Sequence, residues 1–147
     1  MRPAAHYWLL ALLIGALVPE AGAHAQSARD SELDCIARAV YFESGGEPRE
    51  GQIGVAMVIV NRMRHGRFPS TACAVIDNGF YFPRDRAITM EARWVQAWHI
   101  AEGVLEGGLT VPSLRGALYF HGVREKPDWR FRAHHLATIG GHIFYGE

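Results

Sequence analysis

The sequence predicts an α+β domain in which helices come first and a small antiparallel sheet follows. Apolar residues recur at helical spacing between about residues 31 and 106, in segments separated by proline and glycine. The last part of the chain changes to short runs rich in aromatic and β-branched residues, with Gly140-Gly141 between two of them. With 147 residues and 49% hydrophobic content, we expect one domain with a substantial core. Helices followed by strands are typical of the α+β class.

The N-terminus predicts a signal peptide over residues 1–25. Arg2 precedes an apolar run from Trp8 to Val18, and Ala23-His24-Ala25 places small residues where a signal peptidase reads. This run of about eleven residues is shorter than the roughly 20 that span a bilayer. We therefore expect export to the periplasm or cell envelope without stable membrane insertion; a retained membrane anchor is the alternative. Residues 26–30 would form a short disordered leader, and residues 31–147 the folded domain.

The first helix is expected to begin near Ser31, because Ser31-Glu32-Leu33-Asp34 resembles a capping box. Ser44-Gly45-Gly46 would end it, since glycine readily caps a helix C-terminus. Glu43 then falls at the C-terminal end of the apolar face. That face consists of Leu33, Ile36, Ala37 and Val40.

Three further helices are expected. One starts at Pro48 and runs to about Arg64, with an apolar stretch at 53–60 that favours a central buried helix over a buried strand. A short helix starts at Ser70 or Thr71 and leads through residue 76 to an aromatic loop at 80–83. The last helix covers 89–106. Its predicted buried side is Ala92, Val95, Trp98 (or Ala97), Ala101, Val104 and Leu105.

The C-terminal segment predicts strands at 117–121, 137–139 and 142–145. Gly140-Gly141 offers a tight hairpin turn between the last two. Neither an internal repeat nor a low-complexity segment is present in the sequence. Three short strands, two of them joined by a tight turn, would form a small antiparallel sheet.

The charge balance excludes one class of partner. Fifteen basic and fifteen acidic residues cancel, and the basic residues form no continuous block. Proteins that bind nucleic acid usually concentrate Lys and Arg on one face or stretch. We therefore expect no nucleic-acid partner.

Two cysteines, Cys35 and Cys73, lie in the part of the chain expected to be exported. An oxidising compartment favours a structural disulfide between them. The alternative is a pair of buried free thiols. Their spacing matches no zinc-binding motif.

Glu43 is the strongest candidate for a catalytic acid. Glycosidic cleavage needs a carboxylic acid that stays protonated near neutral pH, and burial against apolar groups favours that state. Val40 lies one turn back, Tyr41 and Phe42 are adjacent, and two glycines follow and leave space for a sugar chain. The alternative is a surface carboxylate at a helix end, where the helix dipole would be unfavourable.

Glu47 is the second acidic candidate, because it follows Glu43 across the helix break. Its alternative role, stabilising the positive N-terminus of the next helix, is the one we favour. Without a convincing second carboxylate, the sequence favours chemistry that needs one acid.

Histidines give a rival interpretation, a zinc amidase. His121, His134, His135 and His142 lie close together in the sequence, but there is no His-Glu-x-x-His, and adjacent residues of a strand cannot face one metal. We therefore expect no metal and no cofactor. His121 and His142 are candidates for binding substrate or orienting Glu43, or are structural. Aromatic residues suited to stacking on sugars, about half of which we expect in the core, are Phe80, Tyr81, Phe82, Tyr119, Trp129 and Tyr145.

The stretch from Cys35 to Gln52, which contains Tyr41-Phe-Glu-Ser-Gly-Gly-Glu-Pro48, resembles the signature of SleB/CwlJ-type cell wall hydrolases, the family of spore cortex-lytic enzymes. The resemblance continues in the family order over nearly all of 33–145. Its further blocks are Ile53 to Arg62, Phe68 to Cys73, Ala117 to His121 and Ile139 to Tyr145.

This resemblance implies a lysozyme-like fold and cleavage of peptidoglycan glycan strands between N-acetylmuramic acid and N-acetylglucosamine. The family's catalytic glutamate corresponds to Glu43. Lytic transglycosylases that use a single glutamate have a similar Glu-Ser-Gly-Gly motif, so we expect their mechanism. Muramidase hydrolysis and non-catalytic glycan binding are the alternatives. The chain is expected to act as a monomer. Expected substrate-binding residues are Tyr41, Gln52, Phe82, Tyr119, His121, His142 and Tyr145.

Two segments depart from the family pattern. Many relatives have Ala-Arg where this chain has Ser44-Gly45, a change that leaves the glutamate in place. Relatives often carry a cysteine-containing aromatic segment where this chain has Asn78-Gly-Phe-Tyr-Phe-Pro83. The second departure affects the loop expected to grip the substrate.

Overall fold

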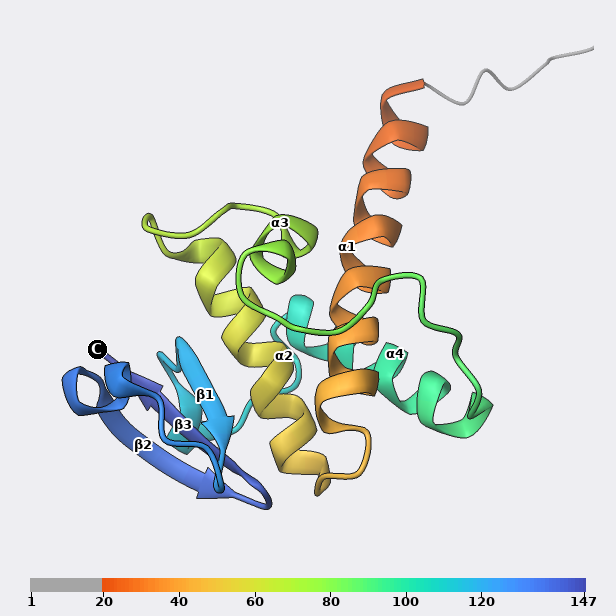
Figure 1. The fold of residues 1–147 in the computed structure, drawn as a ribbon. Coiled ribbons are helices and arrows are strands. Elements are labelled where there is room, and N and C mark those ends of the chain that lie inside the picture. Colours follow the sequence, from red (N-terminus) through yellow and green to blue (C-terminus); the bar gives the residue numbers. More distant parts are fainter. Residues whose placement is uncertain (1–19) are drawn as a thin grey trace, which may run out of the picture.

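The computed structural model describes residues 20–147 and has a helical part beside a three-stranded sheet (Figure 1). The predicted signal peptide lies mostly outside the described residues, so its cleavage stays a prediction. Within residues 20–147, no helix is both long enough and apolar enough to cross a membrane. The helices are α1 (Glu20–Ser44), α2 (Arg49–Arg64), α3 (Ala72–Asp77) and α4 (Glu91–Leu105), with short 3₁₀ turns at Pro112–Leu114 and Asp128–Arg132. The strands are β1 (Tyr119–Gly122), β2 (His134–Ile139) and β3 (His142–Gly146).

Helix α1 begins at Glu20, so the predicted start near Ser31 is wrong. Residues 26–30, expected to be a disordered leader after cleavage, are helical here. Side-chain contacts account for the extension: Gln26 donates to Asp30 one turn ahead at 2.7 Å. Arg29 forms ion pairs with Glu102 and Glu106 at the end of α4. The long helix therefore rises beyond the other elements in Figure 1.

The capping-box residues have a different use. Ser31 lies inside α1, and the Glu32 carboxylate instead accepts a hydrogen bond from the backbone N–H of Ala72, the first residue of α3. A carboxylate at this position satisfies an N–H that has no partner within the helix. The contact fixes α3 against α1 across a long stretch of sequence.

The apolar face predicted for α1 is confirmed, because Leu33, Ile36, Ala37 and Val40 are at most 2% exposed. The helix ends at Ser44, as expected from the glycines that follow. The Ser44 hydroxyl donates to the carbonyl oxygen of Val40 at 2.9 Å, which satisfies a backbone acceptor in the last turn. This termination places Glu43 at the open end of the buried face.

Helix α2 is the central helix that the sequence predicts, and residues 53–60 are all buried. The sheet approaches it closely at Gly54. A methyl group built on Gly54 would lie only 2.6 Å from Cδ1 of Leu114 and 2.7 Å from Cζ of Phe144. At its C-terminal end, Asn61 donates to the carbonyl of Ala117 at 2.9 Å, and Arg62 to that of the next residue at 2.7 Å. These contacts hold the start of β1 against α2.

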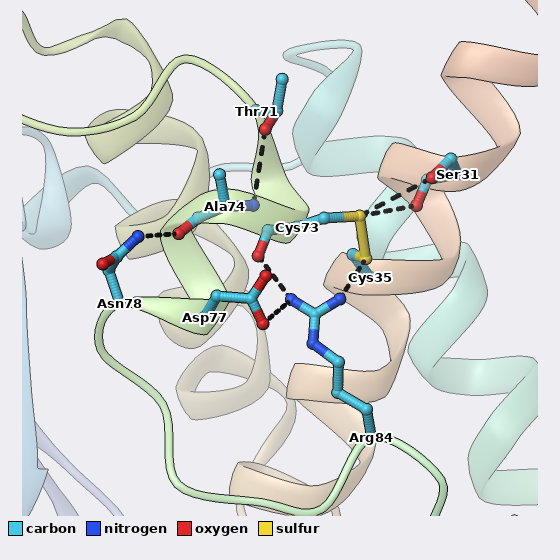
Figure 2. A network of polar contacts seen from close by, with 8 residues as sticks. All are labelled: Ser31, Cys35, Thr71, Cys73, Ala74, Asp77, Asn78 and Arg84. Atoms are coloured by element: carbon cyan, nitrogen blue, oxygen red, sulfur yellow. Dashed lines mark hydrogen bonds and ion pairs between the residues drawn. A yellow bond between two sulfur atoms is a disulfide. The ribbon is translucent and has the colours of Figure 1, made fainter.

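Cys35 of α1 and Cys73 of α3 form a disulfide, as expected, with their Cα atoms 5.3 Å apart (Figure 2). Closing a loop of 38 residues stabilises the fold by about 4 kcal/mol in the chain-entropy model. Arg84 lies beside the disulfide, where it donates to the carbonyl of Cys73 and pairs with Asp77. These contacts secure the loop after α3, which leads toward the aromatic residues.

Helix α4 is where predicted, but its buried face is wrong at Ala92 and Val95, which are exposed, Val95 to 47%. Two tryptophans explain the rotation. The ring of Trp94 lies 6.3 Å from that of Tyr41 and 5.7 Å from that of Trp98. Aromatic rings bury more area than valine, so they turn the helix toward α1. The buried residues are Ala97, Ile100, Ala101 and Val104.

The sheet is antiparallel with strand order β1-β3-β2, and the three predicted strands are present. Strand β2 starts earlier than expected, at His134, and has an irregular register between residues 135 and 137. The predicted Gly140-Gly141 turn is confirmed, and Gly140 has φ of +58°, a conformation that glycine adopts without strain. Central strand β3 buries Phe144 completely against the helices.

Candidate active site

A cleft of about 600 Å³ separates the end of α1 from the sheet. One wall comes from β1 and the chain that follows it, and another from the aromatic loop after α3. Glu43 lies in this cleft, as do three of the predicted substrate-binding residues. The lining residues are Glu43, Arg62, Gly79, Phe80, Tyr81, Tyr119, Phe120, His121, Gly122, Glu125, Pro127, Trp129 and His142.

Glu43 is half-buried, and this burial raises the pKa of its carboxyl group because the ionised form loses solvation. A backbone hydrogen bond from Tyr81 acts in the opposite direction, and the negative charge of Glu125 raises the pKa further. The net effect favours the protonated acid. A carboxyl group in this state, on a rigid helix end beside an open cleft, can donate a proton to a bound ligand.

Glu125 is a second carboxylate in the cleft that sequence reasoning missed. It belongs to the loop after β1, where its Oε2 accepts a hydrogen bond from the backbone N–H of Gly122 at 3.1 Å. Its neighbours are Arg124 and Lys126, so the sequence resembles an ordinary solvated charge run. The available signal in the sequence was that Glu125 follows His121 by four residues. A turn after this strand residue directs the Glu125 side chain back to the cleft.

Arg62 supplies a positive charge at the base of the cleft. Its guanidinium carbon lies 5.1 to 5.7 Å from the ring centroids of Phe68, Phe80 and Tyr119. Burial lowers the pKa of this guanidinium, yet cation–π contacts and the bond to the carbonyl of Leu118 help to keep the charged form. Arg62, the last residue of the family block Ile53 to Arg62, therefore joins the aromatic side chains on this side of the cleft.

His121 is 5% exposed, and both of its ring nitrogens are used within the protein. Nδ1 donates to the carbonyl of Gly122 at 2.8 Å, since a carbonyl oxygen only accepts. In the neutral ring Nε2 then accepts from the Tyr145 hydroxyl at 3.0 Å, and the two rings stack with centroids 5.3 Å apart. His121 thus presents its ring to the cleft, whereas Tyr145 supports it from behind.

His142 also lines the cleft and is 8% exposed. Burial lowers the pKa of its imidazole, while the charges of Glu47 and Glu125 oppose that shift. Its buried Nδ1 has no hydrogen-bond partner among the described residues. A neutral imidazole packed against Phe120, at a centroid distance of 5.1 Å, fits a wall residue.

Four residues expected to bind substrate lie outside this lining: Tyr145, whose hydroxyl bonds to His121, and Tyr41, Phe82 and Gln52. The Tyr41 hydroxyl accepts hydrogen bonds from the backbone N–H groups of Thr89 and Met90, at 3.2 and 3.1 Å, and so tethers the chain before α4. Phe82 packs against Phe42, with their ring centroids 5.3 Å apart.

Gln52 is the fourth, and it is buried between helices. Its Nε2 donates to the carbonyl of Glu47 at 2.8 Å, and its Oε1 accepts from Gln96 of α4 at 2.9 Å. Both amide ends are therefore satisfied within the protein. Of the predicted set, only Tyr119, His121 and His142 line the cleft with Glu43.

Glu47 faces away from Glu43, toward the hairpin between β2 and β3. Its Oε2 accepts a hydrogen bond from the backbone N–H of Gly141 at 2.7 Å. The carboxylate lies so close to the turn that a methyl group on Gly140 would collide with it. The sequence favoured a role for Glu47 at the N-terminus of the next helix, whereas the contact that the structure shows is with the hairpin.

The histidines do not come together as metal ligands. Among residues 20–147, no three side chains of His, Cys, Asp or Glu gather closely enough to hold an ion. His134 and His135 are exposed on β2, and neither lines the cleft. The arrangement offers acid chemistry at Glu43.

Similarity to known proteins identifies the family of this chain. A family model described as Cell Wall Hydrolase matches residues 46–145. The chain belongs to the cell wall hydrolase family. The matched segment includes the sheet, Arg62 and Glu125, and it begins just after Glu43.

Curated relatives of this chain include two spore cortex-lytic enzymes. The one from Oceanobacillus iheyensis is 33% identical over 122 residues, which cover 81% of this chain and 43% of the relative. The one from Bacillus subtilis is 30% identical over 117 residues, covering 78% and 37%. The chain therefore spans less than half the length of these relatives.

Two solved structures resemble this chain. The catalytic domain of the Bacillus cereus SleB protein superposes with a TM-score of 0.60 at 30% identity, over 79% of this chain and 90% of that one. The catalytic domain of the germination-specific lytic transglycosylase SleB from Bacillus anthracis gives 0.58 at 30% identity, over 78% and 93%. The fold is the lysozyme-like α+β fold that the sequence predicted.

Proposed function

We propose that the chain cleaves peptidoglycan glycan strands between N-acetylmuramic acid and N-acetylglucosamine as a lytic transglycosylase, with Glu43 as its catalytic residue. The observation that carries the proposal is the position of Glu43, a half-buried carboxyl with a raised pKa in a cleft of about 600 Å³. The name of the Bacillus anthracis neighbour, a lytic transglycosylase, supports the same reaction class.

In this mechanism Glu43 acts twice. As the bond between C1 of N-acetylmuramic acid and the bridging oxygen breaks, the Glu43 carboxyl gives its proton to that oxygen, which leaves as the 4-hydroxyl of N-acetylglucosamine. The Glu43 carboxylate then takes the proton of the muramyl C6 hydroxyl, whose oxygen bonds to C1. The product carries a 1,6-anhydro ring, no water is consumed, and Glu43 is protonated again.

Digestion of purified sacculi, followed by mass spectrometry of the soluble fragments, tests the proposal. Anhydromuramyl ends are the expected product of the wild-type protein, and Glu43→Gln should release none. Unchanged sacculi in the presence of folded wild-type protein would contradict the proposal and favour a glycan-binding domain. Activity that a chelator abolishes would instead favour a zinc amidase.

Hydrolysis of the same bond is the second candidate, and Glu125 is the observation that favours it. A muramidase uses two carboxylates, one as acid and one as base or nucleophile, and the cleft contains Glu43 and Glu125. This alternative predicts fragments with reducing muramic ends. It also predicts that Glu125→Gln abolishes turnover, whereas a transglycosylase would retain it.

The proposal includes an exported protein. Cleavage after Ala25 would release residues 26–147 into the cell envelope. We expect the released protein to act as a monomer. Mass spectrometry of protein recovered from the periplasm and from the culture medium would identify the mature N-terminus. Light scattering on the same sample would give its mass in solution.

A further inference from the structure

A second hollow, of about 430 Å³, lies directly beside the cleft of Glu43. Tyr119 and Trp129 line both spaces and so form a shared wall. Their ring centroids lie 5.4 Å apart, and Trp129 is held from behind by Tyr145 at 5.5 Å. A ligand bound along the cleft can therefore extend a branch over these rings into the second hollow.

The second hollow is basic. Arg67 and Arg132 line it, and Glu147 is the acidic member of the lining. Arg67 forms an ion pair with Glu147. No ion pair within residues 20–147 involves Arg132, which is exposed where the 3₁₀ turn ends before β2. One guanidinium is thus available to an anion, and a second becomes available if Glu147 moves away.

We infer that this hollow binds a carboxylate of the peptide stem on a muramic acid residue while the glycan strand occupies the cleft. Peptidoglycan stems are short peptides with free carboxylates, attached as side branches at regular intervals along the strand. An arginine beside aromatic rings recognises a carboxylate well, because the planar guanidinium offers paired donors. The inference rests on the proposed function, since the strand must lie in the cleft for its branch to reach the hollow.

Glu147 gives the site an internal competitor. Its carboxylate pairs with Arg67, and His65 Nε2 lies 3.7 Å from its other oxygen. A stem carboxylate that contacts Arg67 has to displace this side chain. Removing the charge of Glu147 should therefore strengthen binding of the stem, whereas removing the charge of Arg132 should weaken it.

The test compares two substrates: glycan strands that carry peptide stems, and the same strands after an amidase has removed the stems. Arg132→Gln should raise KM for stem-bearing strands about three- to fivefold, the size expected of an exposed charge pair. It should leave kcat, and both constants for stripped strands, unchanged, because the hollow is away from the reacting bond. Glu147→Gln should lower KM for stem-bearing strands only.

Arg49→Gln is the matched control. Arg49 is an exposed arginine at the start of α2, whereas Arg67 follows the end of that helix. It should change neither KM. Equal effects of Arg132→Gln on both substrates, or shifts of Arg132→Gln and Glu147→Gln in the same direction, would overturn the inference. Equal KM values of the wild type for both substrates would also overturn it and leave the proposed function standing. Failure of the wild type to cleave either substrate would overturn both.

Discussion

The two glutamates on either side of the break between α1 and α2 have opposite environments. Glu43, in the last turn of α1, lies in the cleft, where burial raises the pKa of its carboxyl. Glu47, four positions on, has its carboxylate hydrogen-bonded to the backbone N–H of Gly141 at the hairpin turn. The intervening Gly45-Gly46 turns the chain, so the two side chains point to different parts of the molecule.

The difference between the two glutamates lies in the largest influence on each carboxyl group. Glu47 has a specific backbone donor, whereas desolvation is the largest influence on Glu43. The donor fixes the Glu47 carboxylate to the hairpin, while desolvation favours the protonated form of Glu43, which can transfer its proton. The comparison predicts that substitutions at the two positions affect different measurements.

The largest expected effect is on turnover. Glu43→Gln should lower kcat by about 10²- to 10⁴-fold, because the amide has no acidic proton to give the leaving oxygen. Release of fragments from purified sacculi measures it. Glu50→Gln, an exposed glutamate in the first turn of α2, is the control and should retain activity. Full activity of Glu43→Gln would contradict the proposed role.

The next effect is on stability. Glu47→Ala should lower the free energy of unfolding by about 1–3 kcal/mol, because the backbone N–H of Gly141 loses its acceptor in a partly buried turn. Urea denaturation measures the change. Glu50→Ala removes a charge from the same helix end without touching the hairpin. An equal loss in both variants would assign the effect to the helix N-terminus instead.

A smaller effect is expected on the pH profile. Glu43 must be protonated to act, so activity falls as pH rises through its raised pKa. Glu125→Gln removes a nearby negative charge, which favours ionised Glu43, lowers its pKa and moves the alkaline limb of kcat/KM to lower pH. The shift should shrink at high salt, because exposed charges are screened. An alkaline limb that does not move would show that Glu125 has no electrostatic influence on the acid.

The smallest expected effect is a gain in stability in Glu43→Gln. Because folding raises the pKa of Glu43, the folded protein binds a proton more tightly than the unfolded chain does. Stability from this group is complete below the unfolded pKa and is lost as pH rises through the folded pKa. The variant, which cannot ionise, should therefore melt a few degrees above the wild type at pH 7 and show no gain at pH 3. Calorimetry at both values measures this.

Local patterns in the sequence were enough to locate most elements and Glu43. The apolar positions from Leu33 to Val40, followed by two glycines, define the end of α1 and the face on which Glu43 lies. Residues 53–60 define the central helix, and Gly140-Gly141 the hairpin. These features depend on neighbours in the chain, which is the range over which periodicity and turn chemistry act.

Features that depend on distant contacts escaped prediction. The extension of α1 to Glu20 needs Arg29 to meet the end of α4, and the rotation of α4 needs Trp94 to meet Tyr41. Glu125 reaches the cleft only because its loop folds back over Gly122. Gln52 looked like a ligand of substrate because of its place in the family signature, whereas its amide joins two helices. Local sequence patterns do not reveal contacts between residues that are far apart in the chain.

The missing side chain at Gly54 has a consequence for how the enzyme could be tuned. Leu114 and Phe144 occupy the space that a methyl group at this position would need. Any larger residue would force Leu114 and Phe144 to move, and Phe144 belongs to the central strand of the sheet that carries β1. Packing in the interior thus helps to set the position of the sheet, and a substitution that does not contact the glycan could still alter the cleft.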